Sequence, residues 1–345
     1  MRRPSSTPTP AQQTRTTPER RSTQPSRHTN RPGAARRARR IAIDAAAEEH
    51  GGVLSRDLLR GLRADRHVIG HAVSSGRWRL LGDQTVAIHS GPLSNLGDRW
   101  RAVWETGLRI AALDGVTALQ QAGLTGFTTD LVQVSIPHGS DPGPIEGVDL
   151  HRVIRRVPRE VVPTGIPRTR PAVAAIRAAH WAVSDRQAAL LLAMPVQQRI
   201  VTPSQLREAA FAVRGRTRRA FIKQVVADIA DGAHSLGELD FAQLCRARGL
   251  PEPSRQVVRR GPRGRVYLDA GWEDVGLAVE IDGAGHRVGL AVTDDLLRQN
   301  AVTIGGELVL RMNLLGLRIE GDAFMDQVCR AHRDRSRRSG YSRGL

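Results

Sequence analysis

The chain has 345 residues, enough for two or three domains with their own cores, and a formal net charge of +18 with a pI near 11.5. Two cysteines without paired spacing exclude a disulfide framework and a cysteine-rich zinc site. No stretch resembles a membrane span or a secretory signal, so we expect a cytoplasmic protein with no membrane partner.

The positive charge favours a polyanionic partner, because its field concentrates phosphates near the surface. Aromatic residues make up only 3% of the chain, which disfavours recognition by base stacking and makes double-stranded DNA the better candidate. Almost all basic residues are arginines, which is explained equally by bidentate phosphate contacts and by GC-rich coding.

The N-terminal segment, residues 1–40, holds eleven Arg and one acid, Glu19, and so carries +10 of the net charge. It also contains six prolines among Ser, Thr and Gln, a composition that cannot bury enough apolar surface to fold. We therefore predict a disordered basic arm. It would add non-specific DNA affinity, or else be a solubilising extension or the product of an upstream start codon.

Residues 41–92 have the order of a winged helix-turn-helix domain. The predicted elements are helices at 41–49, from Ser55 to Leu62 and at 64–75, then a hairpin of Trp78–Leu81 and Thr85–His89 around Gly82-Asp83. In that geometry the third helix enters the major groove of DNA. The same topology also builds protein-docking modules.

Five side chains are the candidate DNA contacts of this domain. Arg66, His67 and His71 on the third helix would face base edges, and Arg77 and Arg79 would lie near phosphates. The two histidines have an i, i+4 spacing that can bind a metal, but no third ligand is visible, so groove contact or a solvated face is favoured.

Residues 98–230 are predicted to form a mostly helical middle domain. The pattern indicates helices at 99–112, 117–122, 171–183, 185–193, 202–213 and 216–231, and strands at 131–136 and 148–153. No catalytic constellation is visible, so a scaffold or partner surface is expected. Four arginines in its last part, Arg214, Arg216, Arg218 and Arg219, are interpreted as a solvated face.

Residues 231–335 are predicted to fold as α-β-β-β-α-β-α, the order of restriction-endonuclease-like domains, before a basic tail at 336–345. The helices are expected at 235–248, 294–305 and 322–333, and the strands at 255–260, 265–269, 276–282 and 307–312. The chain as a whole is thus an α+β multidomain protein. Its last domain contains the most informative motif in the sequence.

That motif combines three carboxylates and a histidine. Alternation along the strand 276–282 places Glu280 and Asp282 on one face and sends Val279 and Ile281 into the core. A turn at 271–274 would bring the preceding strand back so that Asp269 approaches Glu280. Oxygen ligands at that spacing suit Mg²⁺, so Asp269, Glu280 and Asp282 are the candidate metal ligands.

The C-terminal domain resembles an uncharacterised family related to the very-short-patch-repair endonucleases. The matching residues are Ser235-x-x-Glu238, Gly249-Leu250-Pro251, Asp269, Glu280-x-Asp282-Gly283-x-x-His286, Asp294/Asp295 with Arg298, and Leu310-Arg311. The resemblance implies a PD-(D/E)XK fold in which Asp269 and Glu280 hold Mg²⁺, His286 shuttles a proton and Glu238 contacts the metal.

Two features leave an inactive domain as an open alternative. Ser235-x-x-Glu238 is also a helix capping box, and Asp282 stands where such nucleases carry a lysine that stabilises negative charge. Leu268 replaces the proline of the motif name without consequence. In the inactive reading, Asp282-Gly283 forms a structural turn and His286 caps or packs.

Residues 41–230 also resemble, more loosely, AbiEi-type antitoxins of abortive-infection systems. The resemblance is carried by Ala46–Leu62, Gly76-Arg77-Trp78-Arg79 and Thr164-Gly165-Ile166-Pro167, whereas Arg170-Pro171 departs from the family's arginine-threonine pair. It implies a DNA-binding repressor with a nucleotidyltransferase-like toxin as partner. The sequence therefore leaves a metal-dependent DNA endonuclease, a repressor or antitoxin with an inactive nuclease-like domain, and a structural adaptor as competing functions.

Overall fold

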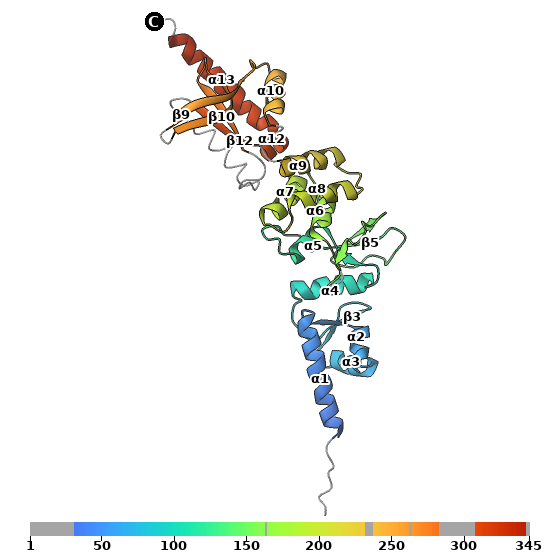
Figure 1. Cartoon of the computed structure of the whole chain (residues 1–345). Coiled ribbons are helices and arrows are strands. Elements are labelled where there is room, and N and C mark those ends of the chain that lie inside the picture. Colours follow the sequence, from blue (N-terminus) through green and yellow to red (C-terminus); the bar gives the residue numbers. More distant parts are fainter. Residues whose placement is uncertain (1–30, 163, 232–236, 262–263, 283–307, 343–345) are drawn as a thin grey trace, which may run out of the picture.

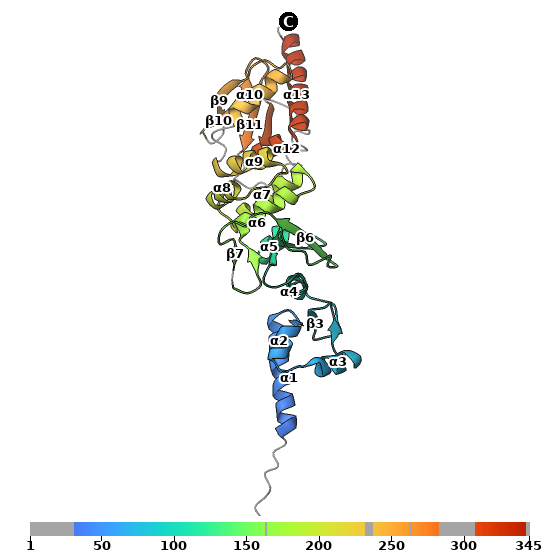
Figure 2. The same ribbon diagram turned by 90° about the vertical axis from the view of Figure 1, so that its right-hand side faces the viewer.

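The computed structural model describes residues 31–342, except for 163, 232–236, 262–263 and 283–307. Helices and strands are mixed, as expected for an α+β protein, and three units follow one another along an elongated molecule (Figures 1 and 2). We call them the N-terminal unit (31–87), the middle unit (95–231) and the C-terminal unit (237–342). None of the described helices combines the length and apolar character that a membrane span requires.

The N-terminal unit packs three helices on a small antiparallel sheet. Its elements are α1 (Arg31–Glu49), β1 (Val53–Ser55), α2 (Arg56–Gly61), α3 (Arg66–Ser74), β2 (Arg79–Leu80) and β3 (Thr85–Ala87). The strand order is β1-β3-β2, with Leu54 opposite Val86. Ile43 from α1, Leu59 from α2 and Ile69 from α3 close the core over that pair.

Two features of this unit differ from the sequence prediction. Helix α1 begins at Arg31 rather than at residue 41, because Gly33–Arg40 is rich in Ala and Arg, both good helix formers, and Pro32 is tolerated in a first helical turn. Residues 31–40 therefore do not belong to a disordered arm, and the rest of that predicted arm lies outside the described residues. Strand β1, three buried residues between a glycine turn and a helix cap, was not predicted.

The middle unit contains a five-stranded sheet in addition to its helices. Its elements are α4 (Asn95–Thr106), β4 (Ala112–Leu113), α5 (Gly115–Gln121), β5 (Val132–Pro137), β6 (Val148–Val153), β7 (Val161–Val162), β8 (Arg168–Thr169), α6 (Pro171–Trp181), α7 (Asp185–Gln197), α8 (Pro203–Ala212) and α9 (Arg219–Asp231). The strand order is β6-β5-β4-β8-β7. The prediction of a mostly helical domain missed β4, β7 and β8, because two-residue strands carry no readable alternation.

Two helices of the middle unit, α4 and α7, end at other residues than predicted. The helix predicted over 99–112 ends at Thr106, because Gly107 adopts φ 112° and the chain turns into β4. Helix α7 continues through Pro195, which was expected to lie in a loop. Helix α6 runs through the centre of this unit, and its Ala174, Ala175 and Ile176 are completely buried.

The C-terminal unit is a four-stranded sheet with helices. Its elements are α10 (Gly237–Ala247), β9 (Ser254–Gly261), β10 (Gly264–Trp272), β11 (Leu277–Asp282), β12 (Leu308–Asn313), α12 (Leu314–Ile319) and α13 (Gly321–Ser342). The strand order is β12-β11-β10-β9, with β11 and β12 parallel and the other pairs antiparallel. Phe241, Val279, Met312 and Phe324 lie in its core.

The predicted order was α-β-β-β-α-β-α. The described elements follow it with α12 added, and the helix expected at 294–305 lies outside the described residues. Gly271 and Trp272 belong to β10, so the turn lies after Trp272 rather than at 271–274. Helix α13 continues to Ser342, so most of the predicted tail at 336–345 is helical. Helix α12 was not predicted.

Close contacts join the N-terminal unit to α4. The ring of His50 lies 4.8 Å from that of Trp100, which stacks on Trp104 at 4.8 Å. The turn after α1 approaches α4 so closely that a Cβ at Gly51 would lie 2.4 Å from the backbone nitrogen of Gly97. A glycine is therefore required at position 51, whose φ is also positive.

Helix α12 joins the middle and C-terminal units. Leu315 is buried in the core of the middle unit, with Ile319 packed against it, whereas Leu317 points into the core of the C-terminal unit. An ion pair between Arg318 Nε and the buried Asp228 Oδ2 of α9, at 3.1 Å, adds a polar contact. Although the predicted boundary at residue 230 separates the two cores, α12 contributes to both.

Candidate functional site

Helix α3 starts where Asp65 caps it. The Asp65 carboxylate accepts hydrogen bonds from the backbone N–H groups of His67 and Val68, at 3.0 and 2.9 Å. The bond from Val68 is the main cause of a pKa below the usual value for the exposed Asp65, and slight desolvation opposes it. The first turn of α3 is thereby fixed with Arg66 and His67 on its outside.

The predicted contact residues of α3 lie on its solvent face. Arg66, His67 and His71 are exposed, while Ile69 and Ala72 on the opposite side are buried. This division follows from the 3.6-residue period of the helix. The α3 face, as we call Arg66, His67 and His71, is therefore free of contacts with the core of the N-terminal unit.

Arg77 extends the α3 face, whereas Arg79 points toward a neighbouring loop. Arg77 Nη2 lies 3.2 Å from His71 Nδ1, and its Nε donates to Ser75 Oγ at 3.0 Å. Arg79 Nη2 instead donates to the carbonyl oxygen of Gly91 at 3.2 Å. Among the described residues, no carboxylate pairs with Arg66, Arg77 or Arg79, so their positive charge is not neutralised locally.

The β2–β3 hairpin is held against the middle unit at its turn. The Glu105 carboxylate of α4 accepts the backbone N–H groups of Asp83 and Gln84, both at 3.0 Å. A Cβ at Gly82 would lie 2.5 Å from the same carboxylate. The tip of this hairpin therefore faces α4, whereas the α3 face stays exposed to solvent.

Two basic residues of the N-terminal unit were missed by the sequence analysis, one near α3 and one at the β2–β3 hairpin. Arg39 of α1 donates through Nη1 to the carbonyl oxygen of Arg63 at 3.2 Å, and Arg56 Nε donates to that of Asp83 at 2.7 Å. Arg39 was assigned to the disordered arm, and its place beside the loop before α3 depends on the longer α1. The alanine content of Gly33–Arg40 was the signal that could have identified it.

The predicted metal site lies on the C-terminal sheet. Val279 and Ile281 are buried while Glu280 is 28% exposed, as the alternation predicted. Ala270 pairs with Val279 across β10 and β11, and continuing this antiparallel register by one residue sets Asp269 opposite Glu280. Asp282 ends β11 and Glu238 lies in α10, whereas His286 and Ser235 lie outside the described residues.

Glu280 already has a cationic partner. Its Oε2 accepts from Arg311 Nε at 2.9 Å, and the two residues are paired in the parallel register of β11 and β12. Within the described part of the chain, no group of three His, Cys, Asp or Glu side chains is positioned to hold a metal. A Mg²⁺ site at Asp269 and Glu280 therefore stays a prediction.

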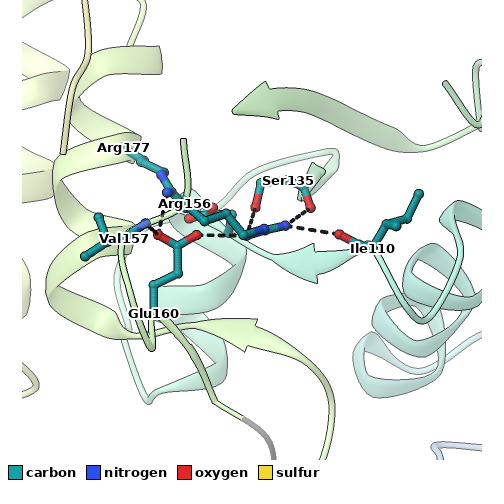
Figure 3. Close-up of polar contacts among 8 residues, drawn as sticks. Ile110, Ser135, Arg156, Val157, Glu160 and Arg177 are labelled. Atoms are coloured by element: carbon teal, nitrogen blue, oxygen red, sulfur yellow. Dashed lines mark hydrogen bonds and ion pairs between the residues drawn. The ribbon is translucent and has the colours of Figure 1, made fainter. Parts of the chain in front are cut away.

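The middle unit contains a buried ionic network that the sequence did not predict (Figure 3). Arg177 of α6 donates to Asp114 Oδ2 at 2.6 Å and to Glu160 Oε2 at 2.7 Å. Glu160 Oε1 also accepts from Arg156 Nη1 at 2.9 Å, and Arg156 Nη2 donates to the carbonyl oxygens of Ile110 and Ser135.

This network has a structural character. The side chains of Asp114, Glu160 and Arg177 are at most 5% exposed, so no substrate has access to them. Burial opposes the charged form of Arg177, but its two carboxylate partners raise the pKa above the usual value. The network therefore fixes β4, the segment before β7 and α6 relative to one another.

Comparisons with known proteins add little. No family model matches the chain, and no curated protein matches it. Among solved structures, the crystal structure of the RV2827C protein from Mycobacterium tuberculosis is similar over 55% of this chain and 75% of that chain. Its sequence identity is 13% and the TM-score is 0.37, a likeness too weak to support a statement about fold or function.

Proposed function

We propose that the protein binds double-stranded DNA through its N-terminal unit, which we interpret as a winged helix-turn-helix domain with α3 as the recognition helix. The main support is the exposed basic α3 face on a unit with the strand order β1-β3-β2. A helix that presents Arg and His side chains outward fits the width of the major groove.

The charge distribution favours DNA over a protein partner for this face. Arg66 and Arg77 have no carboxylate partner among the described residues, and Arg36 and Arg37 on α1 are also exposed. Uncompensated arginines release counterions when they contact phosphates, which is the main source of non-specific DNA affinity. The proposed role is that of a sequence-reading regulator, and a nucleotidyltransferase-like toxin partner stays a prediction.

The test is DNA binding by fluorescence anisotropy with the full chain. Replacing Arg66 and Arg77 by alanine is expected to reduce the slope of log K against log salt by about 1, because Arg77 would lie near a phosphate whereas Arg66 would face base edges. His67→Ala should instead narrow the affinity gap between the chain's own promoter region and unrelated duplex.

The matched control is Arg152→Ala, an exposed arginine of the middle unit that pairs with Asp141. It should leave both the affinity and the salt slope unchanged. The proposal fails if Arg66→Ala/Arg77→Ala binds DNA with the wild-type salt slope, because the affinity would then come from another part of the chain.

A second candidate function is metal-dependent cleavage of DNA by the C-terminal unit, favoured by the register that sets Asp269 opposite Glu280. These two residues and Asp282 would hold Mg²⁺, which would activate water and neutralise charge on the scissile phosphate. Arg311 orients the Glu280 carboxylate through Oε2, so Oε1 is the oxygen that can turn toward a cation. His286 stays the predicted proton shuttle.

Calorimetry with Mg²⁺ and Mn²⁺, together with nicking of supercoiled plasmid, tests this second function. Glu280→Gln is expected to abolish saturable metal binding and to lower cleavage by more than about 100-fold, while DNA affinity stays unchanged. Glu252→Gln, an exposed carboxylate in the same unit, is the control. If wild type binds neither metal even with DNA present, the unit is a nuclease-like fold without activity.

A further inference from the structure

A cavity of about 560 Å³ lies between α8 and α9 in the middle unit. Its inner wall is apolar and comes from α9, where Ile222 and Val226 are 3% exposed. Phe211, at the end of α8, forms part of the opposite wall although its side chain is 78% exposed. A large apolar side chain is thus exposed beside a concave apolar surface.

The rim of the same cavity is cationic. Arg214, Arg219 and Lys223 line it and are exposed, and none of the three forms an ion pair with a described residue. Among the described residues that line the cavity, none carries a carboxyl group. Because none of these described lining residues is acidic, the field at the opening attracts anions. These arginines were interpreted from the sequence as a solvated face.

A buried histidine also lines the cavity. His180 at the end of α6 lines it, and Nδ1 lies 2.5 Å from the carbonyl oxygen of Thr217, which requires the proton on Nδ1. Burial is the main cause of a lowered pKa for His180, and the charges of Arg218 and Arg219 lower it further. The ring is therefore neutral at pH 7 and adds no charge inside the apolar part of the cavity.

We propose that this cavity binds a small organic anion with an apolar body, such as a medium-chain carboxylate. The apolar body would lie on Ile222 and Val226 under Phe211, and the anionic group would contact Lys223 and Arg219 at the rim. The volume falls within the range of about 300–1,000 Å³ that holds small ligands. A phosphate backbone would use the rim but not the apolar interior, so this site is separate from the proposed DNA interface.

A second cavity of about 250 Å³ shares Phe211 and Arg214 with the first and is also lined by Arg155 and Arg156. The two cavities therefore lie next to each other, with Phe211 and Arg214 between them in the lining of both. Phe211 is the residue that would move to admit a longer ligand, because it is exposed and only its backbone is fixed by the end of α8.

Fluorescence titration of the full chain with 1-anilinonaphthalene-8-sulfonate, an aromatic anion, tests the proposal. Wild type should bind the probe saturably at one site, and decanoate should displace it. Decyltrimethylammonium, which has the same apolar chain and the opposite charge, should not. Replacing Arg219 and Lys223 by glutamine should weaken probe binding about tenfold, the effect of losing two partly exposed charge contacts.

Arg216→Gln is the matched control, because Arg216 is an exposed arginine of the loop before α9 and does not line the cavity. It should bind the probe like wild type. Ala210→Trp takes up part of the cavity and should weaken binding. If that variant does not fold, the variants at the exposed positions 219 and 223 still test the proposal. Absence of saturable binding by wild type, equal displacement by the cationic amphiphile, or unchanged binding by Arg219→Gln/Lys223→Gln would overturn the proposal.

Discussion

Arg177→Met is expected to lower the free energy of unfolding of the middle unit by about 3–5 kcal/mol. Methionine fills a similar volume, so the loss comes from charge rather than packing. Asp114 and Glu160 would remain as buried carboxylates without the guanidinium that bridges them at 2.6 and 2.7 Å. Arg156 still contacts Glu160, which leaves Asp114 as the more poorly compensated of the two.

The loss of unfolding free energy in Arg177→Met should be larger at high pH than at low pH. In the variant, burial without a cation raises the folded-state pKa of these carboxylates above the unfolded value. The folded variant then binds more protons than the unfolded chain, so its stability rises as pH falls through that raised pKa. The deficit relative to wild type is therefore expected to be larger at pH 8 than at pH 5.

Native-state hydrogen exchange of α5 and α6 in urea measures the change in unfolding free energy for the middle unit alone. A local measurement is needed because a chain of several units need not unfold in one step. Arg152→Met is the control, because its ion pair with Asp141 is exposed and should contribute less than about 1 kcal/mol. An Arg177→Met loss no greater than that of Arg152→Met would mean that the network is solvated and not structural.

The local parts of the fold could be predicted from the sequence. The cap of α2 by Ser55 was predicted because a capping side chain and its N–H partner are close in sequence, and the structure places Ser55 Oγ as the acceptor for Leu58. Burial of Val279 and Ile281 followed from strand alternation in the same way. In contrast, the predicted start of the first helix at residue 41 was wrong. Helix α1 includes Pro32 in its first turn, and the alanines that follow favour a helix.

Contacts between distant segments could not be predicted. Arg177 lies 63 residues from Asp114 and 17 from Glu160, and no periodic pattern links them. The pairing of Glu280 with Arg311 depends on a parallel strand that approaches from beyond residue 307, so the sequence showed the carboxylate but not its partner. The cavity between α8 and α9 was missed for the same reason, since its lining comes from α6, α8, α9 and the loop before α9.

Helix α12 contributes side chains to the cores of the middle and C-terminal units, and it follows the strand that carries Arg311. It follows β12 directly, and Asn313 caps it by accepting from Gly316 N at 2.5 Å. Strand β12 also carries Arg311, which holds Glu280. A side chain of α12 that enters the middle unit therefore belongs to the same short segment as the partner of the candidate metal ligand.

Leu315→Ala and Leu317→Ala are expected to loosen different units, although they change the same helix. Each replaces a buried leucine and should cost about 2–5 kcal/mol. Because Leu315 packs in the middle unit, its loss should raise hydrogen exchange in α7 and α9; because Leu317 packs in the C-terminal unit, its loss should raise exchange in β11 and β12. Hydrogen exchange followed by mass spectrometry resolves the two, and identical exchange patterns would show that the units unfold as one.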